Sequence, residues 1–292
     1  MKMKRIITII AVLAACVSAT SCYEDFIDDY KFSAVYFASQ KPLRTVIADR
    51  DMSIKVGVTI GGKREVDTND WADFTIDESL LEGTAFTAMP EEYYELSHPS
   101  RMNVSKANLP IADVAISFTD AFYNDEKAIG KHYAIPFKLV DSSTDSLLQD
   151  KTTSIVAVKY ISTWHGTYYV KGQVKAAGED KATVYSNPDL SKNITRDLTT
   201  VSRNVLIRNG VANTTAANEK IRLTFNENGT VTVDTAEGGI AVTGGTSTWE
   251  ESGDRIIIKL AYSYEKGGVT YEVAEELHRR QDPLNDLIFE EW

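Results

Sequence analysis

Residues 52–60 read MSIKVGVTI, and this stretch sets the expectation for the fold. Apolar residues alternate strictly with polar or small ones, and the apolar positions are Ile54, Val56, Val58 and Ile60. Because successive side chains of a β-strand point to opposite faces, this period of two predicts a strand with one buried face. Gly61-Gly62 follows directly and predicts a hairpin turn.

Similar β-rich runs surround this strand, at 33–38, 73–77, 113–118, 133–140 and 154–161. Few helical stretches separate them, so residues 32–162 are predicted to form a β-sandwich. Tyr93 and Tyr94 are expected to pack inside it. Pro136 cannot donate a ladder hydrogen bond, so we expect it at an edge or a bulge.

Residues 163–292 read as a second all-β unit with longer strands and tight turns. Runs at 221–225 and 230–233 flank an Asn-Gly turn that predicts a type I′ hairpin, and further runs flank 252–254. Hairpins between consecutive strands favour an up-and-down antiparallel barrel, which removes exposed sheet edges. The alternation from Ile256 to Tyr264 suits either a filled interior or a small cavity for an apolar ligand.

The N-terminus resembles a bacterial lipoprotein signal. Basic residues precede an apolar run at 6–15, which is shorter than the about 20 residues that span a bilayer, so it predicts a secretory signal. Small-residue boxes precede both Cys16 and Cys22, and the acidic residues after Cys22 resemble the surface-export signal of Bacteroides-type lipoproteins. We therefore favour lipidation of Cys22 over Cys16. This predicts a signal peptide at 1–21, an acidic tether at 22–31 and a lipid anchor in the outer membrane, with the protein facing the cell exterior; secretion without lipidation is the alternative.

Composition excludes several classes of function. The net charge is −11, which argues against a nucleic-acid partner. Two cysteines exclude a disulfide scaffold and a four-cysteine zinc site, and the four histidines lie far apart in the sequence. No phosphate-binding glycine loop or nucleophile elbow occurs, so we expect no cofactor, no metal and no catalytic residues. Carboxylate pairs such as Glu275-Glu276 are expected to be solvated charge.

Several segments resemble a domain of unknown function that is common in Bacteroides-type lipoproteins and is also found at the N-terminus of some endo-β-N-acetylglucosaminidases. They are the stretches at 22–37, 43–47, 74–77, 89–97 and 132–137. Residues 166–169 and 289–292 resemble a companion domain of unknown function. The resemblance implies an immunoglobulin-like N-terminal domain, a lipocalin-like barrel at 163–292, and a cell-surface role in capturing or processing glycans beside an outer-membrane transporter. The hydrolase members carry a separate catalytic barrel whose acidic signature this chain lacks, which weighs against glycosidase activity.

Aromatic residues in polar surroundings are the positive signal for a ligand, because sugars stack their apolar C–H faces on aromatic planes. Trp71, Tyr123 and Trp249 are therefore the candidate glycan-binding residues. By contrast, Trp164, Tyr168, Tyr169 and Trp292 are expected to fill the barrel. The leading hypothesis is a non-catalytic surface protein that binds an oligo- or polysaccharide for uptake. Alternatives are a structural or assembly subunit that docks on an outer-membrane transporter or another lipoprotein, and a hydrolase with an unrecognised site.

Overall fold

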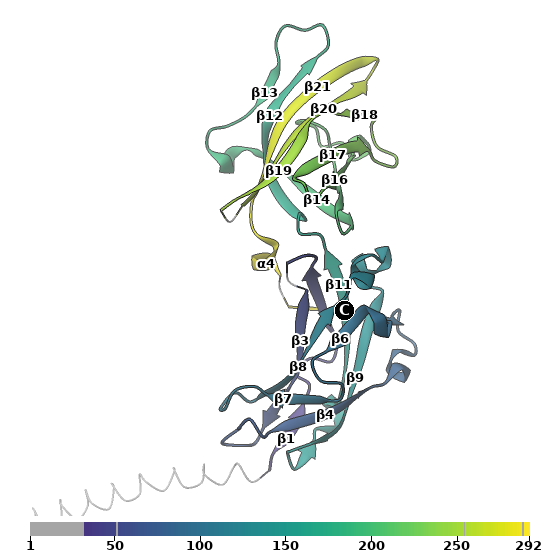
Figure 1. The fold of residues 1–292 in the computed structure, drawn as a ribbon, viewed down its shortest axis with the longest axis vertical. Helices are drawn as coiled ribbons and strands as arrows, with labels where there is room; N and C mark the ends of the chain where they lie inside the picture. The colour runs from purple at the N-terminus through teal and green to yellow at the C-terminus, as the bar shows by residue number, and fades with distance from the viewer. Residues whose placement is uncertain (1–31, 51, 254, 288) are drawn as a thin grey trace, which may run out of the picture.

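The computed structural model describes residues 32–50, 52–253, 255–287 and 289–292. The expected signal peptide, the acidic tether and both candidate lipidation sites, Cys22 and Cys16, lie outside these residues. Two β-rich units follow one another along the long axis of the molecule (Figure 1). The all-β prediction, a sandwich followed by an antiparallel barrel, is confirmed.

The first unit is built almost entirely from short strands. They are β1 (Ala34–Tyr36), β2 (Pro42–Ile47), β3 (Ser53–Gly61), β4 (Trp71–Ile76), β5 (Thr87–Ala88), β6 (Tyr94–Leu96), β7 (Arg101–Val104), β8 (Ile111–Phe118), β9 (Tyr133–Ser142), β10 (Ser146–Leu147) and β11 (Thr153–Ile161). Short helical turns join them: η2 (Glu78–Leu81), η3 (Glu91–Tyr93), α3 (Asp120–Tyr123), η4 (Glu126–Ile129) and η5 (Gln149–Lys151).

Hydrogen bonds link these strands in the order β10-β1-β3-β8-β7-β4-β9-β11-β2. The predicted strand at 52–60 is β3, and its four alternating apolar side chains are all buried. They pack in one core with the apolar side chains of β4, β8, β9 and β11, as a sandwich requires. Tyr93 and Tyr94 pack against this core as expected.

Two local predictions for this unit are wrong. β3 pairs with β1 and β8, so no hairpin forms at Gly61-Gly62. Gly62 has a φ of 70°, and a Cβ there would lie 2.0 Å from the carbonyl oxygen of Phe32, so the glycine serves a close backbone approach. Pro136 is not on an edge strand, because β9 pairs with both β4 and β11. Its missing N–H is tolerated because the β4 ladder ends one residue away, at the pair Ile76↔Phe137.

The second unit has longer strands. They are β12 (Gly166–Ala176), β13 (Thr183–Tyr185), β14 (Ile194–Ser202), β15 (Val205–Arg208), β16 (Ile221–Phe225), β17 (Thr230–Thr235), β18 (Val242–Gly244), β19 (Ser247–Ser252), β20 (Arg255–Lys266) and β21 (Val269–Arg279). Two helical turns lie between them, η6 (Leu190–Lys192) and η7 (Ala217–Glu219), and α4 (Pro283–Asp286) and β22 (Glu290–Glu291) follow.

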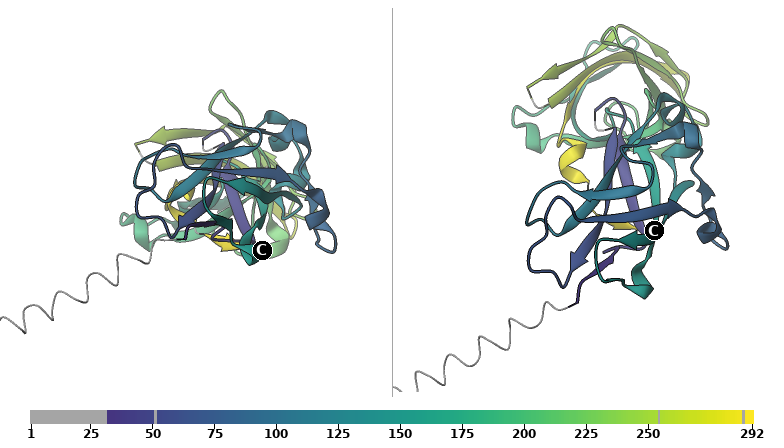
Figure 2. Two further views of the ribbon diagram at one scale, coloured as in Figure 1. Left: turned by 90° about the horizontal axis from the view of Figure 1, so that it is seen from below. Right: turned by 60° about the horizontal axis from the view of Figure 1, so that its bottom comes forward.

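Eight of these strands close an antiparallel barrel in the order β12-β14-β15-β16-β17-β19-β20-β21, and β21 pairs back onto β12. Curved strands of this barrel arch over the sandwich (Figure 2, right). The predicted hairpin between β16 and β17 is present, but Gly229 is the turn residue with positive φ, at 80°. The turn is therefore a type I turn ended by a left-handed glycine, because a type I′ turn needs two positive φ angles.

Apolar side chains form a core inside the barrel. The alternating positions from Ile256 to Tyr264 that point inward are buried together with Trp164 and Tyr168. This favours the filled interior of the two alternatives left open by the sequence. Tyr169 follows Tyr168 on β12, so its side chain points to the opposite face of that strand, where it is half-buried and does not fill the barrel.

The C-terminal segment leaves the barrel and returns to the sandwich. α4 lies between the two units (Figure 1), and β22 pairs with β2 at Leu43↔Glu290. The prediction that Trp292 fills the barrel is therefore wrong, because this residue packs on the sandwich. Its indole Nε1 donates to the carbonyl oxygen of Ile155 at 2.8 Å, and its ring meets Phe86 edge-on at 4.7 Å. The last residues of the predicted barrel domain at 163–292 thus belong to the sandwich.

Ion pairs also join the two units. Arg203, at the β14–β15 turn, contacts Asp49 and donates to Asp120 at 2.7 Å. Arg50, after β2, pairs with Asp282 at 2.8 Å. Together with β22, these contacts fix the barrel against the sandwich.

Candidate functional site

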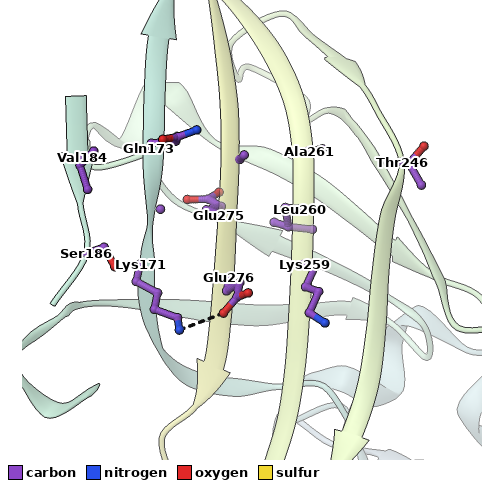
Figure 3. Close-up of a pocket in the computed structure, with 12 residues that line it drawn as sticks. Lys171, Gln173, Val184, Ser186, Thr246, Lys259, Leu260, Ala261, Glu275 and Glu276 are labelled. Carbon is purple, nitrogen blue, oxygen red and sulfur yellow. Dashed lines mark ion pairs between the residues drawn. The ribbon is translucent and has the colours of Figure 1, made fainter. Parts of the chain in front are cut away.

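A shallow groove of about 540 Å³ crosses the outer wall of the barrel over β13, β12, β21 and β20 (Figure 3). Val184 and Ser186 mark one side and Thr246 the other. Side chains of β21 alternate, with Val273, Glu275 and Leu277 buried and Ala274 exposed. Lys171, Ala261 and Ala274 thus line the groove from outward positions, whereas Gly172 occupies an inward position, paired with Glu275.

Small residues form the floor of this groove. Gly172 of β12, Ala274 of β21 and Ala261 of β20 lie on neighbouring strands. A Cβ at Gly172 would lie 2.5 Å from the carbonyl oxygen of Ala274 and 2.5 Å from Cβ of Glu275. Only glycine permits β12 and β21 to approach this closely, and the short side chains leave the floor open to a flat ligand.

Charged side chains at one end of the groove are paired. Lys171 Nζ lies 3.0 Å from Glu276 Oε2, the ion pair drawn in Figure 3, and His278 Nε2 lies 3.1 Å from the same oxygen. The hydrogen bond from Lys171 holds the pKa of Glu276 below its usual range. Lys259 pairs with Glu250 at 2.9 Å, which raises the pKa of Lys259. At neutral pH, this end of the groove therefore holds ion pairs in which each charge is balanced by its partner.

Uncharged hydrogen-bonding groups and one apolar side chain complete the walls. Gln173, Ser186 and Thr246 are exposed and present amide or hydroxyl groups. Val184 has 63% of its surface exposed. Amide and hydroxyl groups both donate and accept, and a small apolar surface beside them suits a ligand that carries hydroxyls on a C–H framework.

A buried polar cluster lies directly behind the groove. Glu275 and Arg208 have no exposed side-chain surface and form a two-pronged ion pair. Tyr262 and Tyr185 each donate to the Glu275 carboxylate at 3.0 Å, and Arg208 donates to the carbonyl oxygen of Ala212 at 2.9 Å. Arg208, Glu275 and Tyr262 are buried in the barrel, and Tyr185 reaches them from β13 with its side chain half-buried.

Electrostatics keeps this cluster in one ionisation state. Burial opposes the charge on Arg208, but the field of Glu275 outweighs it and raises the pKa of Arg208. Burial and then the charge of Glu275 raise the pKa values of Tyr185 and Tyr262. Both tyrosines therefore stay neutral donors near neutral pH, and Arg208 stays charged.

The geometry does not suit glycosidic cleavage at this site. Glu275 and Glu276 are consecutive on one strand, so one carboxylate points into the barrel and the other to the groove. A glycosidase needs two carboxyls that face the same bond at about 5–9.5 Å. In the part of the chain that the structure describes, no group of three or more His, Cys, Asp or Glu side chains could hold a metal ion.

The three aromatic residues selected from the sequence are not brought together. Trp71 begins β4 in the sandwich, and the guanidinium of Arg101 lies 4.0 Å over its ring. Trp249, on β19, meets Trp164 edge-on at 5.2 Å and donates its Nε1 to the carbonyl oxygen of Asn226 at 3.1 Å. Both rings are half-buried and already have protein partners.

The prediction that Tyr123 binds a glycan is wrong. Its polar flanks suggested a loop, but it ends α3 with its ring fully buried in the sandwich core, 5.3 Å from the ring of Tyr160. The groove was not predicted from the sequence, because its floor consists of Gly172, Ala261 and Ala274. Small side chains like these do not suggest ligand binding, as exposed aromatic residues do.

Comparisons with known proteins confirm the resemblance at the level of the fold. Residues 29–146 match a family model described as a "-like, N-terminal domain". Among curated proteins, none matches this sequence. A structure of unknown function from Bacteroides ovatus is similar over 85% of this chain and 95% of its own, with 24% identity and a TM-score of 0.75. That likeness shows the fold.

Two further structures are more distant. Another protein of unknown function from Bacteroides ovatus has 16% identity and a TM-score of 0.44, over 85% of this chain and 94% of its own. A structure described as an auxiliary nutrient binding protein from Bacteroides thetaiotaomicron has 15% identity and a TM-score of 0.42, over 86% of this chain and 95% of its own.

Proposed function

We propose that this chain is a surface lipoprotein that holds a glycan in the outer groove of its barrel without cleaving it. The observation that carries the proposal is the groove itself, a small-residue floor between Gln173 and Ser186 on one side and Thr246 on the other. A sugar ring can lie on the Gly172–Ala274 floor while its hydroxyls exchange hydrogen bonds with the walls.

The paired charges support binding rather than catalysis. Glu276 is held ionised by Lys171, so it has no proton to give to a leaving group. The other carboxylate of the strand, Glu275, is bonded to Arg208 inside the barrel. A groove that fixes its charges in this way binds hydroxyl-rich molecules by matching donors and acceptors.

Filling the groove tests the proposal directly. Calorimetry or affinity electrophoresis of the folded protein across a panel of plant, host and microbial glycans identifies a ligand. Ala274→Trp places an indole on the floor and should weaken binding at least tenfold. Gln173→Leu removes one pair of hydrogen-bonding groups at similar volume and should weaken binding about fivefold.

The matched control is Thr199→Trp, because Thr199 is an exposed residue on β14 and does not line the groove. It should bind the glycan as the parent protein does. The proposal is overturned if the folded protein binds no glycan, or if Ala274→Trp and Thr199→Trp bind equally well.

The anchor is proposed from the sequence, with Cys22 as the lipidated residue and Cys16 as the alternative. No helix within the described residues is both long and apolar enough to cross a membrane. Cys22→Ala should move the protein from the outer-membrane fraction to the soluble fraction, and Cys16→Ala should not. Protease treatment of intact cells should degrade the anchored protein, since we propose that it faces the exterior.

An assembly role is the second candidate, favoured by one observation. The segment that returns from the barrel to the sandwich exposes Leu284, Leu287 and Phe289, the last with 63% of its surface exposed. Such a surface suits docking on an outer-membrane transporter or another lipoprotein. In that case a transporter identified by mass spectrometry should co-purify with the parent protein, be lost with Phe289→Ser and be retained with Ala274→Trp.

A further inference from the structure

A second pocket, of about 280 Å³, lies where the barrel meets the sandwich. Arg50 comes from the sandwich after β2, Arg255 and Glu251 flank the β19–β20 hairpin, and Arg279 ends β21. Asp282 and Asn285, before and within α4, complete the lining. The pocket therefore gathers three guanidinium groups from segments far apart in the sequence.

One carboxylate in this pocket serves two of the arginines. Arg50 donates to Asp282 at 3.0 Å and forms a second contact with it at 2.8 Å. Arg279 donates to the same carboxylate at 3.4 Å, and so does the backbone N–H of Leu284 at 3.1 Å. Burial opposes the charge on Asp282, but the hydrogen bond from Arg50 and the other contacts outweigh it and lower its pKa. Asp282 is thus ionised, and both of its carboxylate oxygens already accept hydrogen bonds from the protein.

Arg255 is the group left over. Its side chain is exposed and forms no hydrogen bond or ion pair with the side chains of the other described residues, although its backbone pairs with Ser252. The Nε atom of Arg279 is buried without a partner. The chain has a net charge of −11, so a pocket lined by three arginines differs in charge from the protein as a whole. Apart from Asp282, Glu251 is the one carboxylate in the described lining of this pocket.

We propose that this junction pocket binds the oxyanion of an acidic sugar, a carboxylate or a sulfate ester. The guanidinium group presents planar N–H donors that match two oxygens of such an anion. Asn285 can exchange hydrogen bonds with the hydroxyls beside it. The pocket is about half the volume of the groove, so it suits one charged sugar residue.

This inference rests on the proposed glycan binding for its choice of a sugar, and it adds a second subsite with a charge preference. Because Arg50 belongs to the sandwich and Arg255 to the barrel, a bound anion contacts both units. Binding should therefore also raise the thermal midpoint of the protein, by an amount that grows with the logarithm of one plus the ratio of ligand concentration to Kd.

The test uses calorimetry on the parent protein at low salt with four probes: glucuronate, glucose 6-sulfate, glucose and inorganic sulfate. One or both acidic sugars should bind and glucose should not, and the sugar that binds identifies the anion. Arg255→Gln should weaken this binding at least tenfold. Raising the ionic strength should weaken it too, because exposed charges are screened.

Arg222→Gln is the matched control, since Arg222 is an exposed arginine on the outer wall at β16. It should bind the acidic sugar as the parent does. The inference is overturned if neither acidic sugar binds, if inorganic sulfate alone binds, or if the two arginine variants lose affinity equally. Ala274→Trp should leave this binding unchanged, so a failure here is distinguishable from a failure of the groove.

Discussion

Removing the charge of Glu275 should unfold the barrel far more readily than removing that of its neighbour Glu276. In the parent protein, Glu275 accepts from both prongs of Arg208 and from Tyr262 and Tyr185, in a site with no exposed side-chain surface. Glu275→Gln keeps the shape and leaves the buried guanidinium without a counter-charge. Breaking a buried pair in this way costs about 3–5 kcal/mol.

The adjacent residue gives the matched control for this change. Glu276 pairs with Lys171 at 3.0 Å, but their side chains are 39% and 32% exposed. Such pairs contribute about 0–1 kcal/mol because water and salt screen them. Glu276→Gln, the same chemical change one position along the strand, should therefore lower barrel stability by about 1 kcal/mol or less.

Native-state hydrogen exchange on β12 and β21 measures the effect in the barrel alone, which avoids treating a protein of two units as two-state. A third variant, Arg208→Met with Glu275→Leu, removes both charges together. It should be less destabilised than Glu275→Gln, because no buried charge is left unpaired. Equal protection in Glu275→Gln and Glu276→Gln, or a double variant that is the least stable of the three, would refute this reasoning.

Three further predictions follow from single contacts. Gly172→Val should lower the barrel's thermal midpoint and abolish glycan binding, since any Cβ there meets backbone atoms of β21; an unchanged midpoint contradicts the close approach. Burial opposes the charge on Asp70, but hydrogen bonds from Lys63 and others outweigh it and hold its pKa below the ordinary value of 3.8. Its contribution to stability is therefore full above about pH 5 and is lost as the pH falls through the lowered pKa, so Asp70→Asn should flatten the acid limb of a stability–pH curve; an unchanged limb argues against it. Trp292→Ala removes the bond to Ile155 and a half-buried ring, and should cost about 2 kcal/mol in urea denaturation of the sandwich; a loss confined to the barrel would contradict the placement of β22.

The strands could be predicted from the sequence because their signal is local. Alternation at 52–60 identified β3, and an Asn-Gly pair identified the turn before Thr230, since both depend on neighbouring residues. The C-terminal return was not predictable in this way. Trp292 meets a partner 137 residues away, and aromatic character alone does not say which of two cores receives it.

The candidate site was harder to predict than the fold. The search favoured aromatic residues in polar company, and that pattern does not separate a ligand platform from a ring that packs below a polar turn. Tyr123 shows this, because Asp120 and Asn124 flank it in sequence while its ring faces the core. A groove floored by Gly172 and Ala274 depends on pairing between strands 102 residues apart, which only the closed barrel brings together.

The groove and the buried cluster are two faces of the same strand, and this links binding to stability. Side chains of β21 alternate, so a slip of one residue would turn Glu275 outward and bring Ala274 and Glu276 into the core. The pairing of Glu275 with Arg208 opposes that slip, because the misplaced arrangement leaves one buried guanidinium without its carboxylate. The buried pair of Glu275 and Arg208 can thus fix the strand register even if it adds little net stability over an apolar core. That register is the one that places small residues on the floor of the groove. We therefore expect the variant with both charges removed to be more stable than Glu275→Gln and yet to hold its glycan less tightly than the parent, since its strands are no longer confined to one alignment.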